Sequence, residues 1–449
     1  MKNEKKGLNR NRLVVMAVGN IIGSGIFLGS STVVSVAGPA AVTAYALGGV
    51  IMAFEVMFIT EMCVIHPASG AFRVHAAEIF GPWIGFVNGW MFWCSGILGM
   101  AGEVVAAATF SRFWFPGIPL WVFCALYAAA MAMVNLSPLR RLSRVEGVLA
   151  SVKVAALLLF LVLGALYLLG FFHSAALPVN QPFRSLKSFL PNGVQGIFAS
   201  MLMVMFSYVG TGIIGLAIAD TDDPAKAAPP AIRVITSSVS LLYILSILFI
   251  VLLIPWKGIR TSSSPLVLIL NHMHIPWSDD ILNFIVLTAS LSGLNSSMYS
   301  SSRMLYSLGK DRQAPSLFLK TNRNGVPAFA LLVSGTALLS TAVLSYFLPQ
   351  KAFVLLATAS GFLALLNWLT ISVTHFFYRR KTLREHPEKL RYKAPGYPYT
   401  TILEVLLILG IFATSFLYPG QIGGLIGSLL LLLGLLLFYF ALRHRGTLK

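Results

Sequence analysis

Apolar stretches of about 20 residues recur roughly a dozen times along the chain, and this recurrence limits the fold more than any other feature. A stretch of that length can span a bilayer as a helix, because a helix satisfies its own backbone polar groups. We place the spans near residues 13–35, 40–65, 83–110, 119–136, 147–171, 194–219, 230–254, 279–302, 327–348, 352–377, 400–418 and 421–442. The connections are short, so we expect an all-α polytopic membrane protein of about 12 transmembrane helices without a separate soluble domain.

The charges also fit a membrane protein. Hydrophobic residues make up 57% of the chain and charged residues 11%, which few soluble domains show. The net charge of +18 could suggest nucleic acid, but most of the 33 Lys and Arg residues flank helix ends that share one side. The positive-inside rule predicts that this side is the cytoplasm. We therefore expect a multi-pass protein of the plasma membrane with both termini in the cytoplasm, and no nucleic-acid partner.

Two glycine-rich segments interrupt otherwise apolar helices. Residues 19–27 read Gly-Asn-Ile-Ile-Gly-Ser-Gly-Ile-Phe, and residues 206–212 read Phe-Ser-Tyr-Val-Gly-Thr-Gly. They fall in the first and sixth predicted spans, at matching positions of two five-helix halves, as in secondary transporters with inverted repeats. Backbone groups that a break frees inside the membrane must line a site, because lipid cannot satisfy them. The two segments therefore predict a carrier of a small zwitterion.

The first break can hold both ends of an α-amino acid. Where the helix restarts near Gly23, Ser24 and Gly25, free amides and the positive end of the helix dipole suit a carboxylate. Carbonyls before the break, around Ile21, suit an ammonium group. Close helix packing through small residues explains a single break equally well. The second break, at the matching position, favours a site.

The motifs of the chain resemble those of the amino acid–polyamine–organocation superfamily, and specifically its bacterial amino acid permease branch. The resemblance runs almost end to end. It rests on residues 19–27, 61–62, 67–72, 81–90, 223–226, 230–232 and 295–305. It implies a LeuT-type fold, in which an N-terminal tail (1–12) precedes ten helices in two inverted repeats (about 13–171 and 194–377). A basic cytoplasmic loop (378–399) and two peripheral helices with a cytoplasmic tail (400–449) would follow.

The same resemblance implies a substrate site at the two breaks. The substrate carboxylate would bind at Ser24 and Gly25, and the ammonium at the carbonyls of Ile21, Phe206 and Val209. Phe206 would be the gating aromatic; plain core packing is the alternative role for this side chain. The full set of expected substrate-binding residues is Ile21, Gly23, Ser24, Gly25, Phe206, Ser207, Val209 and Gly210.

Charged residues inside spans are costly and are functional candidates by default. Lys153 lies about two turns into the fifth predicted helix. From the sequence alone, its side chain can extend back to the membrane surface. The resemblance instead places its ammonium where sodium-coupled relatives hold sodium, and we expect Lys153 to take part in proton coupling. Glu103, in the family context Met-Ala-x-Glu, is expected to carry a proton or meet the substrate; a structural carboxyl between helices is the alternative.

Three further ionisable side chains lie in or near the predicted spans. Glu61 is expected to anchor a loop, and His375 to lie at the membrane interface. Glu55 is a buried acid with no assigned role. The family commonly has an apolar residue there and a basic one two positions later, where this chain has Met57.

The favoured function is proton-coupled import of a small or medium neutral amino acid. The family often has a glutamate where this chain has Gly212. A negative group there would help to hold a cationic side chain, so its absence argues against a cationic substrate. An exchanger of the same fold remains open, as does a channel or a receptor. No nucleophile–base pair, metal cluster or phosphate loop is evident, so we expect no enzyme activity, cofactor or metal. The expected partners are the free amino acid, protons and membrane lipid, with no obligate partner subunit.

Overall fold

The computed structural model is built of helices, and it describes residues 10–68, 70–137, 139–171, 182–218, 221, 223–259, 263–273, 277–416 and 419–444. The residues 1–9 of the expected N-terminal tail and 445–449 of the expected C-terminal tail lie outside this range. The first half contains α1 (Arg10–Ile21), η1 (Gly25–Gly29), α2 (Ser30–Ala37), α3 (Ala41–Ile65), α4 (Phe72–Phe80), α5 (Pro82–Ser111), α6 (Leu120–Asn135) and α7 (Leu139–Leu168). The rest contains α8 (Leu186–Phe189), α9 (Gly193–Tyr208), α10 (Gly212–Ile218), α11 (Pro224–Leu253), α12 (Pro265–His272), α13 (Ser278–Lys310), α14 (Ala328–Phe347), α15 (Ala352–Glu385), α16 (Tyr399–Ser415) and α17 (Pro419–His444).

Within the described residues, nine helical runs are long and apolar enough to cross a membrane. The first, Leu13–Ile65, contains both of the first two expected spans. Two shorter apolar helices, Leu120–Asn135 and Tyr399–Ser415, stand where the fourth and eleventh spans were expected. The chain is therefore an all-helical protein with many membrane-crossing segments.

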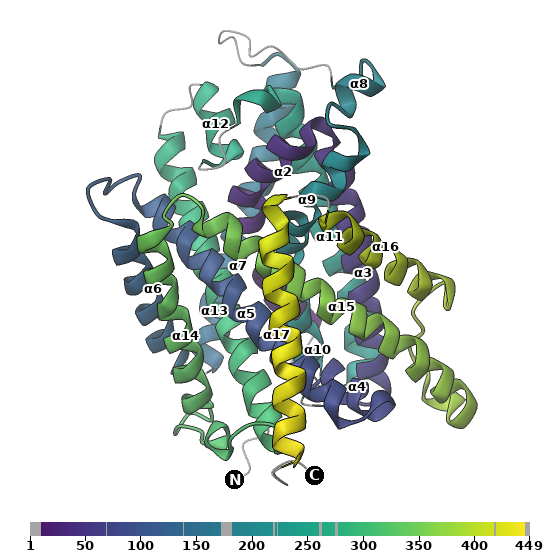
Figure 1. Cartoon of the computed structure of the whole chain (residues 1–449). Coiled ribbons are helices and arrows are strands. Elements are labelled where there is room, and N and C mark those ends of the chain that lie inside the picture. Colours follow the sequence, from purple (N-terminus) through teal and green to yellow (C-terminus); the bar gives the residue numbers. More distant parts are fainter. Residues whose placement is uncertain are drawn as a thin grey trace.

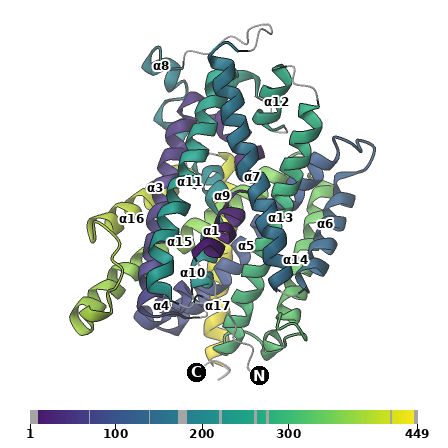
Figure 2. The same ribbon diagram turned by 180° about the vertical axis from the view of Figure 1, so that it is seen from behind.

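The interrupted helices lie at the centre of the bundle (Figures 1 and 2). α1, α9 and α10 are surrounded by the long helices α3, α5, α7, α11, α13 and α15. α6 and α14 pack together on one side, and α16 and α17 pack on α15 from outside. α4 lies at the end of the bundle where α1 begins and α17 ends, whereas α8 and α12 lie at the opposite end. The segments that carry the predicted site are thus the most enclosed.

Several helices extend beyond the expected spans, among them α7, α11, α13 and α15. α7 begins at Leu139 rather than near 147, and α15 continues to Glu385 rather than 377. Apolar length marks only the part of a helix in hydrocarbon, and Arg, Lys and Glu continue a helix well outside it. Lys153 therefore lies about four turns into its helix rather than two. The first part of the expected basic loop 378–399 forms the last two turns of α15.

Glu61 and His375 lie close together near one end of α3 and α15. Glu61 anchors the segment after α15, as expected, because one carboxylate oxygen accepts hydrogen bonds from Arg379 at 3.0 Å and from the Ala394 amide at 2.5 Å. The His375 ring is fully buried and stacks on Phe58 at 4.2 Å. Phe58 of α3 and Thr401 of α16 enclose the ring, and the interfacial depth of His375 stays a prediction.

Candidate functional site

The first break separates α1 from the π-helical turn η1. α1 ends at Ile21, and the backbone restarts at Gly25. The Ile21 carbonyl that the break frees accepts a hydrogen bond from the Tyr243 hydroxyl of α11 at 3.0 Å. The same hydroxyl lies 3.2 Å from the carbonyl of Ser207 in the other interrupted helix. One tyrosine therefore connects the two breaks.

The second break separates α9 from α10, and its geometry requires glycine at position 210. Gly210 has φ of +114°, a conformation that other residues rarely adopt. A Cβ atom there would also lie 2.9 Å from the carbonyl oxygen of Asn20. The Asn20 amide donates a hydrogen bond to the Gly210 carbonyl at 2.7 Å. The two breaks thus touch directly, through Asn20 and Gly210.

The Glu103 carboxylate accepts a hydrogen bond from the Ser24 amide, the group at which we expected the substrate carboxylate to bind. The Ser24 amide lies 3.0 Å from each carboxylate oxygen of Glu103, which reaches across from α5. A Cβ atom at position 23 would lie 2.3 Å from Glu103 Oε1, so a larger residue there would displace this carboxyl. The amide at the restart of the first helix therefore does bind a carboxylate, and in this structure the carboxylate belongs to the protein.

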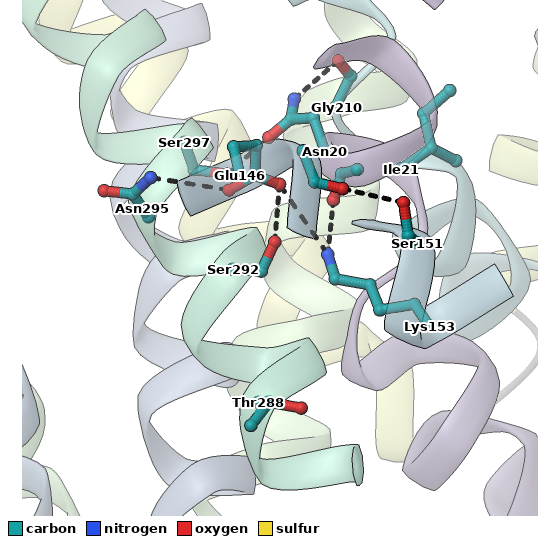
Figure 3. A network of polar contacts seen from close by, with 12 residues as sticks. Asn20, Ile21, Glu146, Ser151, Lys153, Gly210, Thr288, Ser292, Asn295 and Ser297 are labelled. Carbon is teal, nitrogen blue, oxygen red and sulfur yellow. Dashed lines mark hydrogen bonds and ion pairs between the residues drawn. The ribbon is translucent and has the colours of Figure 1, made fainter. Parts of the chain in front are cut away.

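Lys153 lies against the first break and not at the membrane surface (Figure 3). Its side chain is fully buried, and Nζ donates a hydrogen bond to the Gly19 carbonyl at 2.5 Å. Nζ lies 3.9 Å from Glu146, which is seven residues earlier on α7. The Glu146 carboxylate accepts hydrogen bonds from Ser292 at 2.5 Å and from Asn295 at 3.4 Å, both on α13. The lysine therefore belongs to a polar network that joins α1, α7 and α13.

The eight expected substrate-binding residues all lie at the two breaks, but they differ in what surrounds them. Gly25 packs on Ser207 so closely that a Cβ atom would lie 2.5 Å from the Ser207 Cα. Phe206 is buried and makes an edge contact with Phe353, with ring centroids 6.0 Å apart. Val209 is half-buried, as is Gly210. The first part of the expected site is thus closely packed, and the second break is more open.

A pocket lies beside the second break. Its walls come from Asn20, from residues 209–213 and from α3, α4, α5, α13 and α15. Of the expected site residues, Val209 and Gly210 line it. Glu55, for which the sequence suggested no role, lines it too. The pocket therefore has an acidic side chain after all, contributed by α3 rather than by the sixth span.

Sequence reasoning missed several residues of the site, and Glu146 is the clearest. It stands seven residues before Lys153, a spacing that puts two side chains on the same face of a helix. That spacing was a usable signal. Tyr243 had none, because its hydroxyl reaches the breaks from a helix that is distant in sequence.

Comparison with known proteins identifies the class of the chain. Residues 12–444 match the family model for amino acid permeases. The chain belongs to the amino acid permease family, within the amino acid–polyamine–organocation superfamily. It is therefore a multi-pass membrane transporter for amino acids and not an enzyme.

Several named bacterial proteins are similar over most of their length. The chain is 34% identical to the gamma-aminobutyric acid permease of Bacillus subtilis (strain 168), covering 91% of this chain and 87% of that protein. It is 33% identical to the gamma-aminobutyric acid permease of Escherichia coli (strain K12), covering 96% and 92%. It is 32% identical to the amino-acid permease RocC of Bacillus subtilis (strain 168), covering 95% and 93%.

Proposed function

We propose that this permease is a secondary active symporter that imports a small or medium neutral amino acid together with protons. Its fold would be of the LeuT type, with twelve spans: two inverted repeats of five, followed by α16 and α17. The nine long apolar runs, of which the first holds two spans, and the two shorter apolar helices support that number. Both termini would face the cytoplasm of a plasma-membrane protein, in accord with the distribution of Lys and Arg.

The observation that carries this proposal is the contact between the two breaks. Asn20 bonds to Gly210, and Tyr243 lies within hydrogen-bond distance of both interrupted helices. A substrate that binds backbone groups at one break would alter the other through these contacts. A single ligand that binds at one interrupted helix can therefore change the conformation of both.

Glu103 offers a way to couple the substrate to a proton. Its carboxylate and the substrate carboxylate would compete for the same Ser24 amide. A protonated Glu103 is a weaker acceptor, so protonation would release the amide and favour the substrate. In this scheme the proton enters on Glu103 with the amino acid, and both leave on the other side.

Lys153 would hold the first break in place through the cycle. Its ammonium supplies a positive charge at the Gly19 carbonyl without any bound cation. Lys153 and Glu103 both contact the first break, Lys153 at the Gly19 carbonyl and Glu103 at the Ser24 amide. Gain or loss of a proton on one of these groups would therefore be felt by the other.

Two features support a neutral substrate. Gamma-aminobutyric acid, named in two of the relatives, is a zwitterion without a charged side chain. Position 212 carries glycine rather than an acid, and packs against Phe92. The acid that does line the pocket, Glu55, is compatible with a neutral substrate if it is protonated.

Uptake by purified protein in liposomes tests the proposal. Labelled neutral, cationic and anionic amino acids, with gamma-aminobutyric acid among them, are offered with and without an inward proton gradient in sodium-free buffer. We expect accumulation of a neutral amino acid only with the gradient. Uptake that ignores the gradient and requires internal amino acid would identify an exchanger instead. Binding without transport would identify a receptor.

A further inference from the structure

Arg73 is a buried charged residue that the proposed function leaves unused. It lies on α4, and only 1% of its surface is exposed. α4 packs against α3, α5 and α15, whereas the guanidinium of Arg73 extends to the end of α13. A charge in such surroundings is costly unless it is paired and hydrogen-bonded. The partners of Arg73 therefore show what this side chain holds together.

The guanidinium binds three residues around the end of α13. Nη1 donates a hydrogen bond to Gln313 Oε1 at 2.6 Å, and Nη2 donates to the carbonyl and hydroxyl oxygens of Ser307 at 3.2 and 3.0 Å. Nη2 also forms an ion pair with Asp311, whose side chain is half-exposed. The planar guanidinium can bind several acceptors at once, which a lysine ammonium cannot reproduce in the same geometry. We call Arg73 and these three partners the latch.

The α13 side of the latch is itself fixed to α5. The Gln313 side chain donates a hydrogen bond to the Pro82 carbonyl at 2.9 Å, and Trp90 Nε1 donates to the Gln313 carbonyl at 3.3 Å. Gly89 of α5 leaves room for the arginine, because a Cβ atom there would lie 2.5 Å from Arg73 Cδ. The latch therefore holds α4 against a surface that α5 and the end of α13 form together.

α4 contributes one wall of the pocket beside the second break. Phe72, the first residue of α4, lines the pocket and packs on Phe92 of α5, with ring centroids 5.3 Å apart. The preceding residue, Ala71, lies against α10, because a Cβ atom at Gly215 would be 3.1 Å from the Ala71 Cβ. α4 lies at the end of the bundle where α1 begins and α17 ends (Figure 1). Movement of α4 away from α10 would therefore open the pocket at that end.

The backbone is strained on both sides of the latch. Ala71 has φ of +44°, and Arg312, which lies between two of the partners of Arg73, has φ of +58°. Residues with a Cβ atom rarely adopt positive φ, and the described part of the chain has one further non-glycine example, Trp277. Such conformations persist where surrounding contacts enforce them, and they cluster at segments that switch. The bonds of Arg73 connect the two strained segments.

We propose that Arg73 is a positioning residue for transport, which holds α4 and Phe72 against the pocket until its bonds to the α13 side break. The half-exposed Asp311 is the partner at which water competes most readily for the guanidinium. Release of the latch frees the strained backbone beside Phe72, which favours a pocket open towards this end of the bundle. The amino acid would then leave past α4, and that part of the inference rests on the proposed function.

Cysteine labelling of purified protein tests the latch without transport. Ala364→Cys places a thiol in the pocket wall on α15. The native Cys124, which is buried on α6, is the internal reference in the same molecule. A charged maleimide is added, and mass spectrometry of peptides gives the labelling rate at each site. The Ala364→Cys protein is compared with the same protein carrying Arg73→Gln or Asp311→Asn. The control, Arg323→Gln, makes the same chemical change on an exposed arginine.

We expect Arg73→Gln to raise the labelling rate at position 364 about tenfold or more, because loss of a hydrogen bond to a charged group shifts an equilibrium by at least that factor. Asp311→Asn should raise the rate less, since it removes one half-exposed partner. The rate at Cys124 should not change, and the control should match its parent. Equal rates at position 364 in Arg73→Gln and its parent would overturn the inference. So would a similar rise at Cys124, because the substitution would then loosen the whole protein.

The Asp311→Asn protein keeps the inference testable if Arg73→Gln does not fold. Its altered side chain is half-exposed, so the substitution leaves no buried charge without solvent. A labelling rate at position 364 equal to that of the parent would then overturn the inference.

Uptake into liposomes adds a readout that rests on the proposed function. Protein whose pocket is open towards α4 is not available to substrate from the opposite side, so the apparent affinity falls with the available fraction. In Arg73→Gln the KM for uptake should rise several-fold, while the maximum rate changes less. A lower maximum rate with an unchanged KM would indicate only a loss of active protein and would overturn the inference. If wild type transports no amino acid, the proposed function fails, and the labelling rates still decide whether the latch exists.

Discussion

The ion pair between Lys153 and Glu146 gives a prediction with a magnitude. The atoms Lys153 Nζ and Glu146 Oε1 are 3.9 Å apart, and both side chains are buried. At an effective dielectric constant of about 20, their attraction is about 4 kcal/mol. Lys153→Met would leave Glu146 buried without a counter-ion, which typically costs about 3–5 kcal/mol. We therefore expect a loss of that size in the free energy of unfolding.

A double-mutant cycle measures this pair. Wild type, Lys153→Met, Glu146→Gln and the double variant are unfolded by SDS titration in detergent micelles. The double variant should be destabilised by much less than the sum of the single variants, because it contains no unpaired charge. The exposed pair Lys226–Asp223, with a separation of 3.3 Å, is the control. Surface pairs contribute about 0–1 kcal/mol, so its cycle should show little coupling.

Additivity would refute the electrostatic reasoning. If the two buried substitutions add within about 0.5 kcal/mol, the charges do not interact as the structure suggests. The same Lys153→Met protein also tests the functional role. Proton-driven uptake that survives unchanged in this variant would remove Lys153 from the coupling mechanism.

Three further substitutions at the breaks have defined outcomes. Gly210→Ala should lower stability by about 1–3 kcal/mol through backbone strain alone, and should abolish transport because its Cβ collides with Asn20; normal uptake by this variant would contradict the geometry. Tyr243→Phe should cost about 1 kcal/mol and weaken substrate binding, measured by ligand-dependent thermal shift; unchanged values would mean that its hydroxyl does not connect the breaks. Glu103→Gln should make substrate affinity independent of pH near neutrality in equilibrium binding, and a pH profile equal to that of wild type would argue against Glu103 as the proton carrier at Ser24.

Residue patterns predicted the helical class and the two breaks well. Apolar runs of spanning length leave few folds available, since lipid cannot satisfy an open backbone. Glycines at matching positions marked where the helices would break, and the structure has both breaks there. Helix ends were less predictable: α7 and α15 run past their apolar stretches, because helix formation and membrane depth depend on different properties of a side chain.

The chemistry around the breaks was harder to predict, because it depends on contacts between distant segments. The sequence by itself determined an all-helical membrane protein with two interrupted helices, since local composition decides which segments enter a bilayer. Only the tertiary structure decided that Glu103 from α5 accepts a hydrogen bond from the Ser24 amide, and that Glu55 from α3 lines the pocket beside the second break. Ser24 and Glu103 are 79 residues apart, and no periodicity in a single sequence reports such a contact. Packing of the helices brings them together, so their role depends on the fold.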